Sequence, residues 1–170
     1  MMTRRRWLGL LSSLGLAGTA AQSASPAAGA ASAAPGAARL QPLVISDEQW
    51  RQRLSPAQYK VLRKEGTEPA GSSPLNAEKR NGQFHCAGCD LPLFSSKMKY
   101  ESGTGWPSFF TTLPGVFQTK RDHGLFLPRT EYHCARCGGH HGHVFEDGPK
   151  PTGLRYCNNG VALKFVAEAA

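Results

Sequence analysis

The chain has 170 residues, a length that suits one ordinary domain and excludes a large multidomain protein. Hydrophobic residues make up 40% of it, yet no window holds the ~20 unbroken apolar residues of a spanning helix, which excludes stable membrane insertion. The formal net charge is +8, but Arg4, Arg5 and Arg6 supply three of the positive charges, and 17 basic and 12 acidic residues remain from Arg39 onward. This mild bias, spread along the chain, does not favour a nucleic-acid partner.

The N-terminus has the pattern of an export signal. The arginines precede a modest apolar stretch over residues 7–21, and small residues that suit a signal peptidase follow. Paired arginines before an aromatic residue and a leucine resemble the twin-arginine type of signal. Residues 17–38 are all Ala, Gly, Ser, Thr, Pro or Gln and cannot bury enough apolar surface to offset their ordering entropy. We therefore predict that residues 1–38 are a signal peptide and linker, cleaved after Ala21 or Ala33, and that the protein is periplasmic or otherwise exported.

Two short helices are expected at the start of the domain, which we place at residues 39–170. Ser46 can cap the first helix, and Gln49 three residues later completes a capping box. Ser55 can cap the second, with Pro56 in its first turn and Gly66 beyond its end.

After Gly66 the helical pattern disappears and short β-type runs follow. Residues 125–132 and 161–166 are two of these runs, separated by segments rich in glycine and proline. In the second run Val161, Leu163 and Phe165 alternate with the other residues, as in a strand with one buried face. The sequence therefore predicts a mostly β domain.

The cysteines indicate a metal site. Four of the five form two Cys-x-x-Cys pairs: Cys86 with Cys89, and Cys134 with Cys137. Two such turns facing each other make a closed tetrahedral site of four sulfur atoms, and Gly88 and Gly138 suit turns that need a positive φ. Two disulfides are the competing interpretation in an exported protein. We predict one structural Zn²⁺ per chain, pinning coiled antiparallel sheets together; a twin-arginine signal fits this, because it exports proteins already folded.

Four sulfur ligands leave the zinc no open position for chemistry, and they leave Cys157 alone. An unpaired cysteine in an exported protein is a candidate reactive thiol, and a buried inert cysteine is the alternative. Arg155, two residues earlier, would lie on the same face of a strand and lower the pKa of the thiol. Three histidines within His140–His143 follow the second cysteine pair, and they suit either a second metal site or general-acid work.

Several ordered motifs resemble the B-type peptide methionine sulfoxide reductases. They are Gly105-Trp106-Pro107-Ser108-Phe109, Gly142-His143-Val144-Phe145, Asp147-Gly148-Pro149, Pro151-Thr152-Gly153 and Arg155-Tyr156-Cys157-x-Asn159, together with the paired cysteines. The similarity spans residues 46–165, nearly the whole predicted domain. It implies an enzyme that repairs oxidised proteins by reducing the R epimer of methionine sulfoxide.

The resemblance also implies roles for single residues. Cys157 matches the nucleophile that attacks the sulfoxide sulfur and becomes a sulfenic acid, and His140 and His143 match the pair that protonates the leaving oxygen. Asn159 and Arg155 match polar groups of the site, Asp147 a supporting residue, and Trp106 the aromatic that packs against the S-methyl group. His141 stands where the family often has an apolar residue, and no role is assigned to it.

One departure from the family changes the expected cycle. Many members have a resolving cysteine where this chain has Thr104. With four cysteines on zinc, the sulfenic acid of Cys157 must be reduced by an external small thiol or a thioredoxin-like partner. A non-catalytic zinc-scaffold binding module is the main alternative; a nucleic-acid binder and a thiol–disulfide oxidoreductase are weaker ones.

Overall fold

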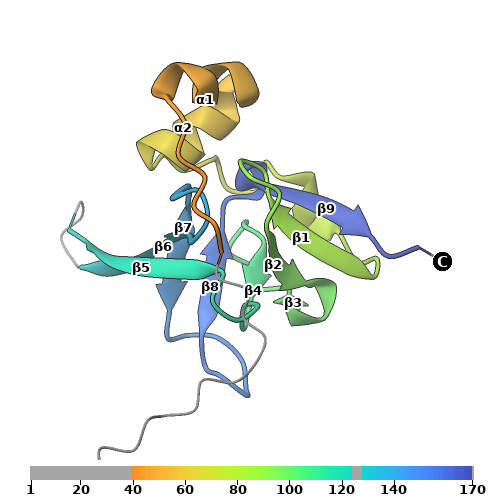
Figure 1. Cartoon of the computed structure of the whole chain (residues 1–170). Helices are drawn as coiled ribbons and strands as arrows, with labels where there is room; N and C mark the ends of the chain where they lie inside the picture. The colour runs from red at the N-terminus through yellow and green to blue at the C-terminus, as the bar shows by residue number, and fades with distance from the viewer. Residues whose placement is uncertain (1–39, 124–127, 170) are drawn as a thin grey trace, which may run out of the picture. The chain divides into compact units, whose positions relative to one another are not determined.

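The computed structural model describes residues 40–123 and 128–169, so the predicted signal and linker lie outside the described residues. Helices α1 (Asp47–Arg53) and α2 (Pro56–Lys64) come first (Figure 1). Both predicted capping boxes are present. The amide of Gln49 donates to the Ser46 hydroxyl at 3.2 Å, and the Gln49 side chain accepts from the Ser46 amide at 2.8 Å. Ser55 caps α2 in the same way, so local side-chain chemistry fixes where each helix begins.

The end of α2 differs in detail from the expectation. Glu65, not Gly66, adopts the left-handed conformation, with φ of 54°. Gly66 instead packs closely against the last turn of α2, because a Cβ there would lie 2.9 Å from the carbonyl oxygen of Lys60. The amide of Gly66 donates to that same oxygen at 3.0 Å, which closes the last turn.

Nine strands form two antiparallel sheets in the described part of the chain. The strands are β1 (Gly82–Cys86), β2 (Pro92–Ser95), β3 (Lys99–Tyr100), β4 (Ser108–Phe109), β5 (Phe117–Asp122), β6 (Arg129–Cys134), β7 (His140–Phe145), β8 (Arg155–Asn158) and β9 (Leu163–Ala167). One sheet has the order β2-β1-β9 and the other the order β3-β4-β8-β7-β6-β5. The expectation of a mostly β fold with antiparallel sheets and two N-terminal helices is confirmed.

The two predicted β runs are shifted in the structure. The last run begins as a 3₁₀ turn at Gly160–Ala162, so β9 starts at Leu163 rather than at Val161. Within β9, Leu163 and Phe165 face inward while Lys164 and Val166 face outward, as the alternation predicts. The other run, residues 125–132, lies partly outside the described residues; β6 starts at Arg129 and extends to Cys134.

An aromatic stack joins the two sheets. Phe94 of β2 lies against Phe109 of β4 with ring centroids 3.9 Å apart, and Phe84 of β1 meets Phe109 edge-on at 5.0 Å. All three rings have no exposed surface. Burial of these three rings contributes apolar free energy that holds the sheets together.

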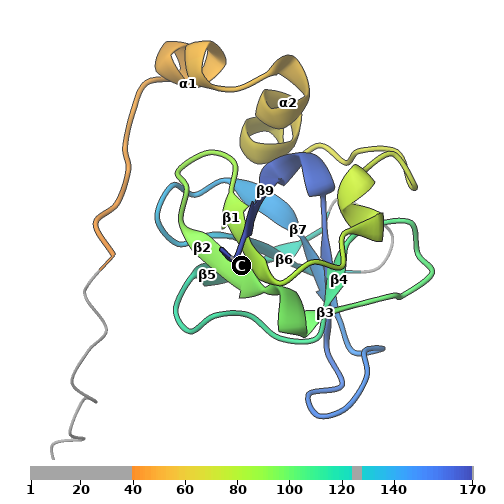
Figure 2. The same cartoon turned by 90° about the vertical axis from the view of Figure 1, so that its right-hand side faces the viewer.

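Both helices lie on one side of the two sheets, near the end where the cysteine turns project (Figures 1 and 2). Helix α2 packs against β7 and against the 3₁₀ turn at Gly160–Ala162. Val61 and Leu62 are its most buried side chains. No helix of the described residues has the length and apolar character that a membrane crossing needs.

Candidate active site and metal cluster

Strand register places Cys157 in the middle of a row of polar side chains. On β8 it lies directly opposite His143 of β7 on one side and Ser108 of β4 on the other. His143 in turn lies opposite Glu131 of β6. Directly opposed residues of an antiparallel sheet point to the same face. The row therefore brings a thiol, an imidazole and a carboxylate onto one face.

An irregularity in β7 adds His140 to this row. Residues three apart in a regular strand face opposite sides of the sheet. The register between β6 and β7 shifts at Tyr132 and His133, however, so that His140 pairs with His133. The rings of His140 and His143 consequently lie 5.5 Å apart, in an edge-to-face arrangement.

A carboxylate holds each of these histidines. Nδ1 of the buried His140 lies 2.7 Å from Glu131 Oε1, and Nε2 of His143 lies 2.7 Å from Asp122 Oδ2. Nε2 of His140 is buried and has no hydrogen-bond partner within the described residues. His140 therefore has one buried ring nitrogen that no described residue satisfies. Neither acid was singled out from the sequence, because both come from strands that meet the histidines only through sheet pairing.

Burial and neighbouring charges have opposite effects on the pKa values of Glu131 and His143. Burial raises the pKa of Glu131, but the hydrogen bond and charge of His140 and the cation of Lys120 outweigh it and hold that pKa below its usual range. Burial lowers the pKa of His143, and the hydrogen bond to Asp122 only partly opposes this. His143 is therefore more readily neutral, and Glu131 more readily ionised, than each would be in water.

The Cys157 thiol is half-buried, and burial raises its pKa above the usual range. The Arg155 guanidinium and the Thr104 hydroxyl each lower the pKa of this thiol, but by less than burial raises it. The expectation that Arg155 lowers this pKa is correct for its own contribution, but desolvation outweighs it. The negative charge of Asp147 raises the pKa of the Cys157 thiol.

Arg155 is fixed by a two-pronged ion pair with Asp147. The Arg155 Nε and Nη2 atoms donate to the two carboxylate oxygens at 2.8 and 2.7 Å, and the guanidinium lies 4.4 Å from the centroid of the Phe145 ring. The Asp147 side chain is 60% exposed, whereas that of Arg155 is only 10% exposed. The arrangement makes Asp147 a residue that orients Arg155 at the rim of the site.

A pocket opens over the thiol. Its cavity volume is about 120 Å³, which suits a single side chain. Its lining residues are Thr67, Trp106, Arg129, Gly142, His143, Phe145, Cys157 and Asn159. The structure therefore brings Trp106, His143, Cys157 and Asn159 together around one cavity. Three other predicted site residues do not line it: His140, Arg155 and Asp147.

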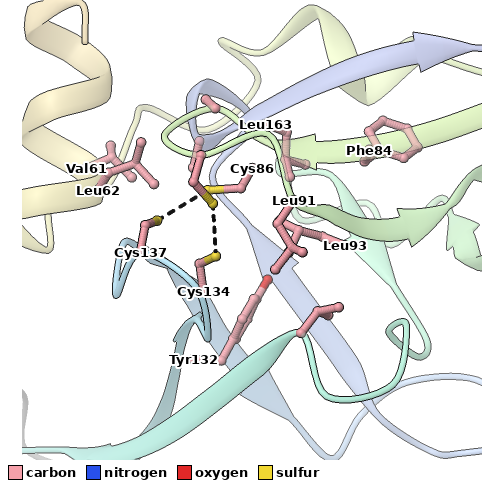
Figure 3. Close-up of a cluster of buried hydrophobic side chains, with 14 of the residues drawn as sticks. Val61, Leu62, Phe84, Cys86, Leu91, Leu93, Tyr132, Cys134, Cys137 and Leu163 are labelled. Atoms are coloured by element: carbon pink, nitrogen blue, oxygen red, sulfur yellow. Dashed lines mark hydrogen bonds between the residues drawn. The ribbon is translucent and has the colours of Figure 1, made fainter. Parts of the chain in front are cut away.

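The four paired cysteines, from turns of both sheets, form one cluster, in which Figure 3 labels Cys86, Cys134 and Cys137. All four are buried, and their sulfur atoms lie within 4.8 Å of one another. Sγ of Cys86 is 3.7 Å from that of Cys137, and Sγ of Cys89 is 3.5 Å from that of Cys134. A tetrahedral ion with metal–sulfur bonds of about 2.3 Å separates its ligands by about 3.8 Å. The four sulfurs therefore fit a tetrahedral metal ion, and none of them forms a disulfide.

The two cysteine turns use different residues for their positive φ. Gly138 has φ of 68°, as expected for the second turn. In the first turn Asp90, not Gly88, takes the left-handed conformation, with φ of 66°. Gly88 instead lies close to the cluster, since a Cβ there would be 3.5 Å from the Cys137 sulfur.

Comparison with known proteins agrees with this geometry. Residues 54–167 match the SelR domain family. The chain belongs to the B-type peptide methionine sulfoxide reductases. It is 51% identical over 124 residues to the peptide methionine sulfoxide reductase MsrB of Leptospira interrogans, covering 72% of this chain and 95% of that protein. It is 53% identical over 117 residues to MsrB of Pseudomonas entomophila, covering 68% and 89%. It is 47% identical to the chloroplastic B1 reductase of Arabidopsis thaliana, covering 72% and 61%.

Glu68 is a residue of this B-type reductase domain that sequence patterns did not reveal. Its carboxylate accepts from the amides of Gly160 and Val161, in the turn that follows Cys157. Its own amide donates to the Asn159 side chain at 2.9 Å, and its carbonyl accepts from the Trp106 indole at 3.1 Å. One buried residue thus ties together two sides of the pocket. A single acid in a loop of the sequence carries no local signal of this role.

His141 also has surroundings that the sequence did not indicate. Its side chain has no exposed surface, and burial lowers its pKa to about 3. Its Nε2 lies 3.4 Å from the sulfur of Cys86. In this B-type reductase domain, His141 therefore contacts the metal cluster, while His143 lines the thiol pocket and His140 lies beside His143.

Proposed function

We propose that this protein reduces peptide-bound methionine R-sulfoxide to methionine, with Cys157 as the nucleophile. The observation that supports this most strongly is the row of Glu131, His143 and Cys157 beneath a pocket walled by Trp106. A sulfoxide needs a nucleophile at sulfur and a proton at oxygen, and the row provides both. The R configuration is inferred from the family resemblance.

In the proposed reaction the Cys157 sulfur attacks the sulfoxide sulfur, and His140 or His143 protonates the sulfoxide oxygen. A bond forms between the two sulfur atoms, and the protonated oxygen leaves as water when the sulfur–oxygen bond breaks. Water then attacks the Cys157 sulfur, and the sulfur–sulfur bond breaks with its electron pair going to methionine, which leaves Cys157 as a sulfenic acid. Methionine gains the two electrons that the thiol loses. His143 lies opposite Cys157 and lines the pocket, and His140, which is bonded to Glu131, lies beside it.

The walls of the pocket suit the remainder of the substrate. Trp106 and Phe145 line it with aromatic surface, which favours the apolar S-methyl group and side-chain carbons. Asn159 and Arg129 add polar groups at the same cavity. The Trp106 ring is itself positioned, because its indole N–H is bonded to Glu68.

Regeneration is proposed to need an external reductant. The chain has five cysteines, and four lie in the cluster, so two molecules of a small thiol, or one thioredoxin-like dithiol, reduce the sulfenic acid and release water. Many members of the family have a resolving cysteine at the position of Thr104. The Thr104 hydroxyl lowers the pKa of the Cys157 thiol, but it cannot form a disulfide with it.

We propose Zn²⁺ as the metal of the cluster, held by Cys86, Cys89, Cys134 and Cys137. Four sulfur ligands are a common donor set for structural zinc and leave no open position. When bound, the ion supplies cross-linking between the two sheets rather than chemistry.

The proposed site of action is outside the cytoplasm, reached through a twin-arginine signal. Changing Arg4 and Arg5 together to lysine in the full chain is expected to retain the protein in the cytoplasm, as measured by fractionation of cells that express it. Unchanged export of the double variant would contradict this route and leave the reductase proposal intact.

The activity itself is tested by single turnover without reductant. Purified protein is mixed with peptides that carry separated R or S methionine sulfoxide, methionine is quantified per enzyme, and a sulfenic-acid probe is located by mass spectrometry. About one equivalent of methionine from the R epimer alone, with the probe on Cys157, is expected.

Cys157→Ser is the matched variant and is expected to give no product while keeping the fold and the bound metal. No product from either epimer with folded, metal-loaded wild-type protein would refute the reductase proposal. A non-catalytic zinc-scaffold binding module would then be the better account.

A further inference from the structure

The metal cluster has an imidazole beside one of its sulfur atoms. Two other polar side chains lie near it, but Arg63 and Arg136 donate to the carbonyl oxygens of Cys137 and Cys89. Nε2 of His141 is 3.4 Å from Sγ of Cys86, a distance suited to an N–H···S hydrogen bond. The ring is completely buried and packs edge-on against Phe117, with ring centroids 5.3 Å apart. The Tyr132 ring stacks parallel to it at 6.4 Å. The imidazole is thus held between the aromatic core of the larger sheet and the sulfur.

The chemistry of a metal-bound thiolate determines which atom donates this hydrogen bond, Nε2 of His141 or Sγ of Cys86. A cysteine that ligates a metal has lost its proton and can only accept a hydrogen bond. The neutral imidazole must therefore carry its proton on Nε2 when the cluster is loaded. Four thiolates around a divalent cation have a net charge of −2, which is costly to bury unless nearby donors offset it. An N–H directed at Cys86 supplies one such donor.

We propose that His141 donates its Nε2–H to the Cys86 thiolate and thereby slows loss of the metal from the cluster. This inference rests on the zinc occupancy proposed above. His141 is a positioning residue here, because it acts on the metal through the sulfur that it contacts.

The backbone of the same residue reaches the thiol pocket. The carbonyl oxygen of His141 accepts from the amide of Asn159 at 2.8 Å and from its side-chain Nδ2 at 2.9 Å. His141 thus contacts the cluster with its side chain and a pocket-lining residue with its carbonyl. The Cys86 contact holds its ring, and the Asn159 contacts hold its backbone.

Two variants of His141 separate donation from packing. His141→Leu fills the space with an apolar side chain and removes the donor, whereas His141→Gln replaces the N–H with an amide donor that reaches a similar place. Tyr132→Phe is the matched control, since it removes a buried hydroxyl bonded to Asn158 beside the same ring and leaves the sulfur contact. Zinc content is measured by mass spectrometry, and the rate of zinc transfer to a chromogenic chelator is measured on the full chain.

The Leu variant is expected to release zinc about 10-fold faster than wild type, the lower end of what loss of a partner of a metal ligand costs. The Gln variant and Tyr132→Phe are expected to stay near the wild-type rate. Independently of any variant, long-range ¹H–¹⁵N spectra of zinc-loaded wild type are expected to show the His141 proton on Nε2.

Three results would overturn the proposal. The first is a wild-type release rate for folded His141→Leu, the second is equal acceleration by Tyr132→Phe, and the third is a proton on Nδ1 in the spectra. Wild-type protein that retains no zinc would refute the zinc proposal itself and this inference with it, without bearing on reductase activity, which is measured separately.

Discussion

At the scale of single residues, the reactivity of Cys157 depends on its thiol pKa, on which burial and the charge of Arg155 have opposite effects. Burial raises the thiol pKa and the guanidinium opposes it. The thiolate is the reactive form, so alkylation of Cys157 by iodoacetamide is expected to accelerate as pH rises and not to level off below the ordinary range of a cysteine. Arg155→Met removes the opposing charge and should move the profile to still higher pH. The rate at Cys157 is followed by mass spectrometry, with Lys97→Met as the control; an unmoved profile would contradict the assignment.

Glu131 is expected to position the His140 ring. Glu131→Gln keeps an oxygen acceptor for Nδ1 but removes the negative charge beside the ring. Steady-state kcat/KM should fall by about 10²-fold, the lower range for general-acid catalysis. Glu65→Gln is the matched control, because Glu65 pairs with the same Lys120 but has an exposed side chain and contacts neither histidine. A parallel loss in both variants would count against a role through His140.

Thr104 is the position where an internal resolving thiol is missing. Its hydroxyl acts on the Cys157 thiol and is 2.8 Å from the hydroxyl of Ser102. Thr104→Cys is therefore expected to form a disulfide with Cys157 after one turnover, in place of a persistent sulfenic acid. Non-reducing peptide maps of quenched reactions would show this bridge in the variant and not in wild type. A variant whose Cys157 stays fully reactive with the sulfenic-acid probe would disprove the inferred proximity.

At the scale of elements, the close pairing of β7 and β8 depends on Gly142. A Cβ at this position would lie 1.9 Å from the carbonyl oxygen of Cys157. Gly142→Ala must therefore separate the two strands that carry His143 and Cys157. We expect the free energy of unfolding to fall by about 1–3 kcal/mol. We also expect kcat to fall in the molecules that remain folded, which a general destabilisation would not cause. Denaturant titration and kinetics well below the unfolding midpoint distinguish the two effects.

Gly115→Ala is a useful control, since it strains an exposed turn with positive φ that lies outside the thiol pocket and the metal cluster and has open space around its Cβ. Equal loss of kcat in folded Gly115→Ala and Gly142→Ala would show that strand separation is not the cause.

The helices and the strands differ in how far the sequence predicts them. Ser46 and Ser55 identify both helix starts, because each capping box closes within three residues. The start of β9 is misplaced by two residues, because Gly160–Ala162 is held as a turn by Glu68, more than ninety positions away. The irregularity that brings His140 beside His143 is equally invisible in the sequence, since it is a feature of the pairing between β6 and β7.

At the scale of the whole molecule, the cluster joins turns from both sheets. Cys86 and Cys89 lie at the end of β1, whereas Cys134 and Cys137 lie at the end of β6. Binding of a metal at such a site contributes directly to folding free energy. Removing the metal with a strong chelator under reducing conditions is expected to lower the thermal unfolding temperature and to abolish activity, and returning Zn²⁺ should restore both. Calorimetry with and without the chelator checks this; an unchanged unfolding temperature after verified metal removal would contradict it.

The sequence by itself determined the features that depend on neighbours in the chain: two capped helices, the paired cysteines, the single remaining Cys157 and the ordered motifs that identify the family. Each is set by contacts or spacings within a few residues, or by motif order alone. The tertiary structure decided that Glu131 holds His140, that Glu68 holds Asn159 and Trp106, and that His141 faces Cys86. These contacts join segments whose proximity depends on strand order and register, and the physical forces that select a register are spread over the whole sheet.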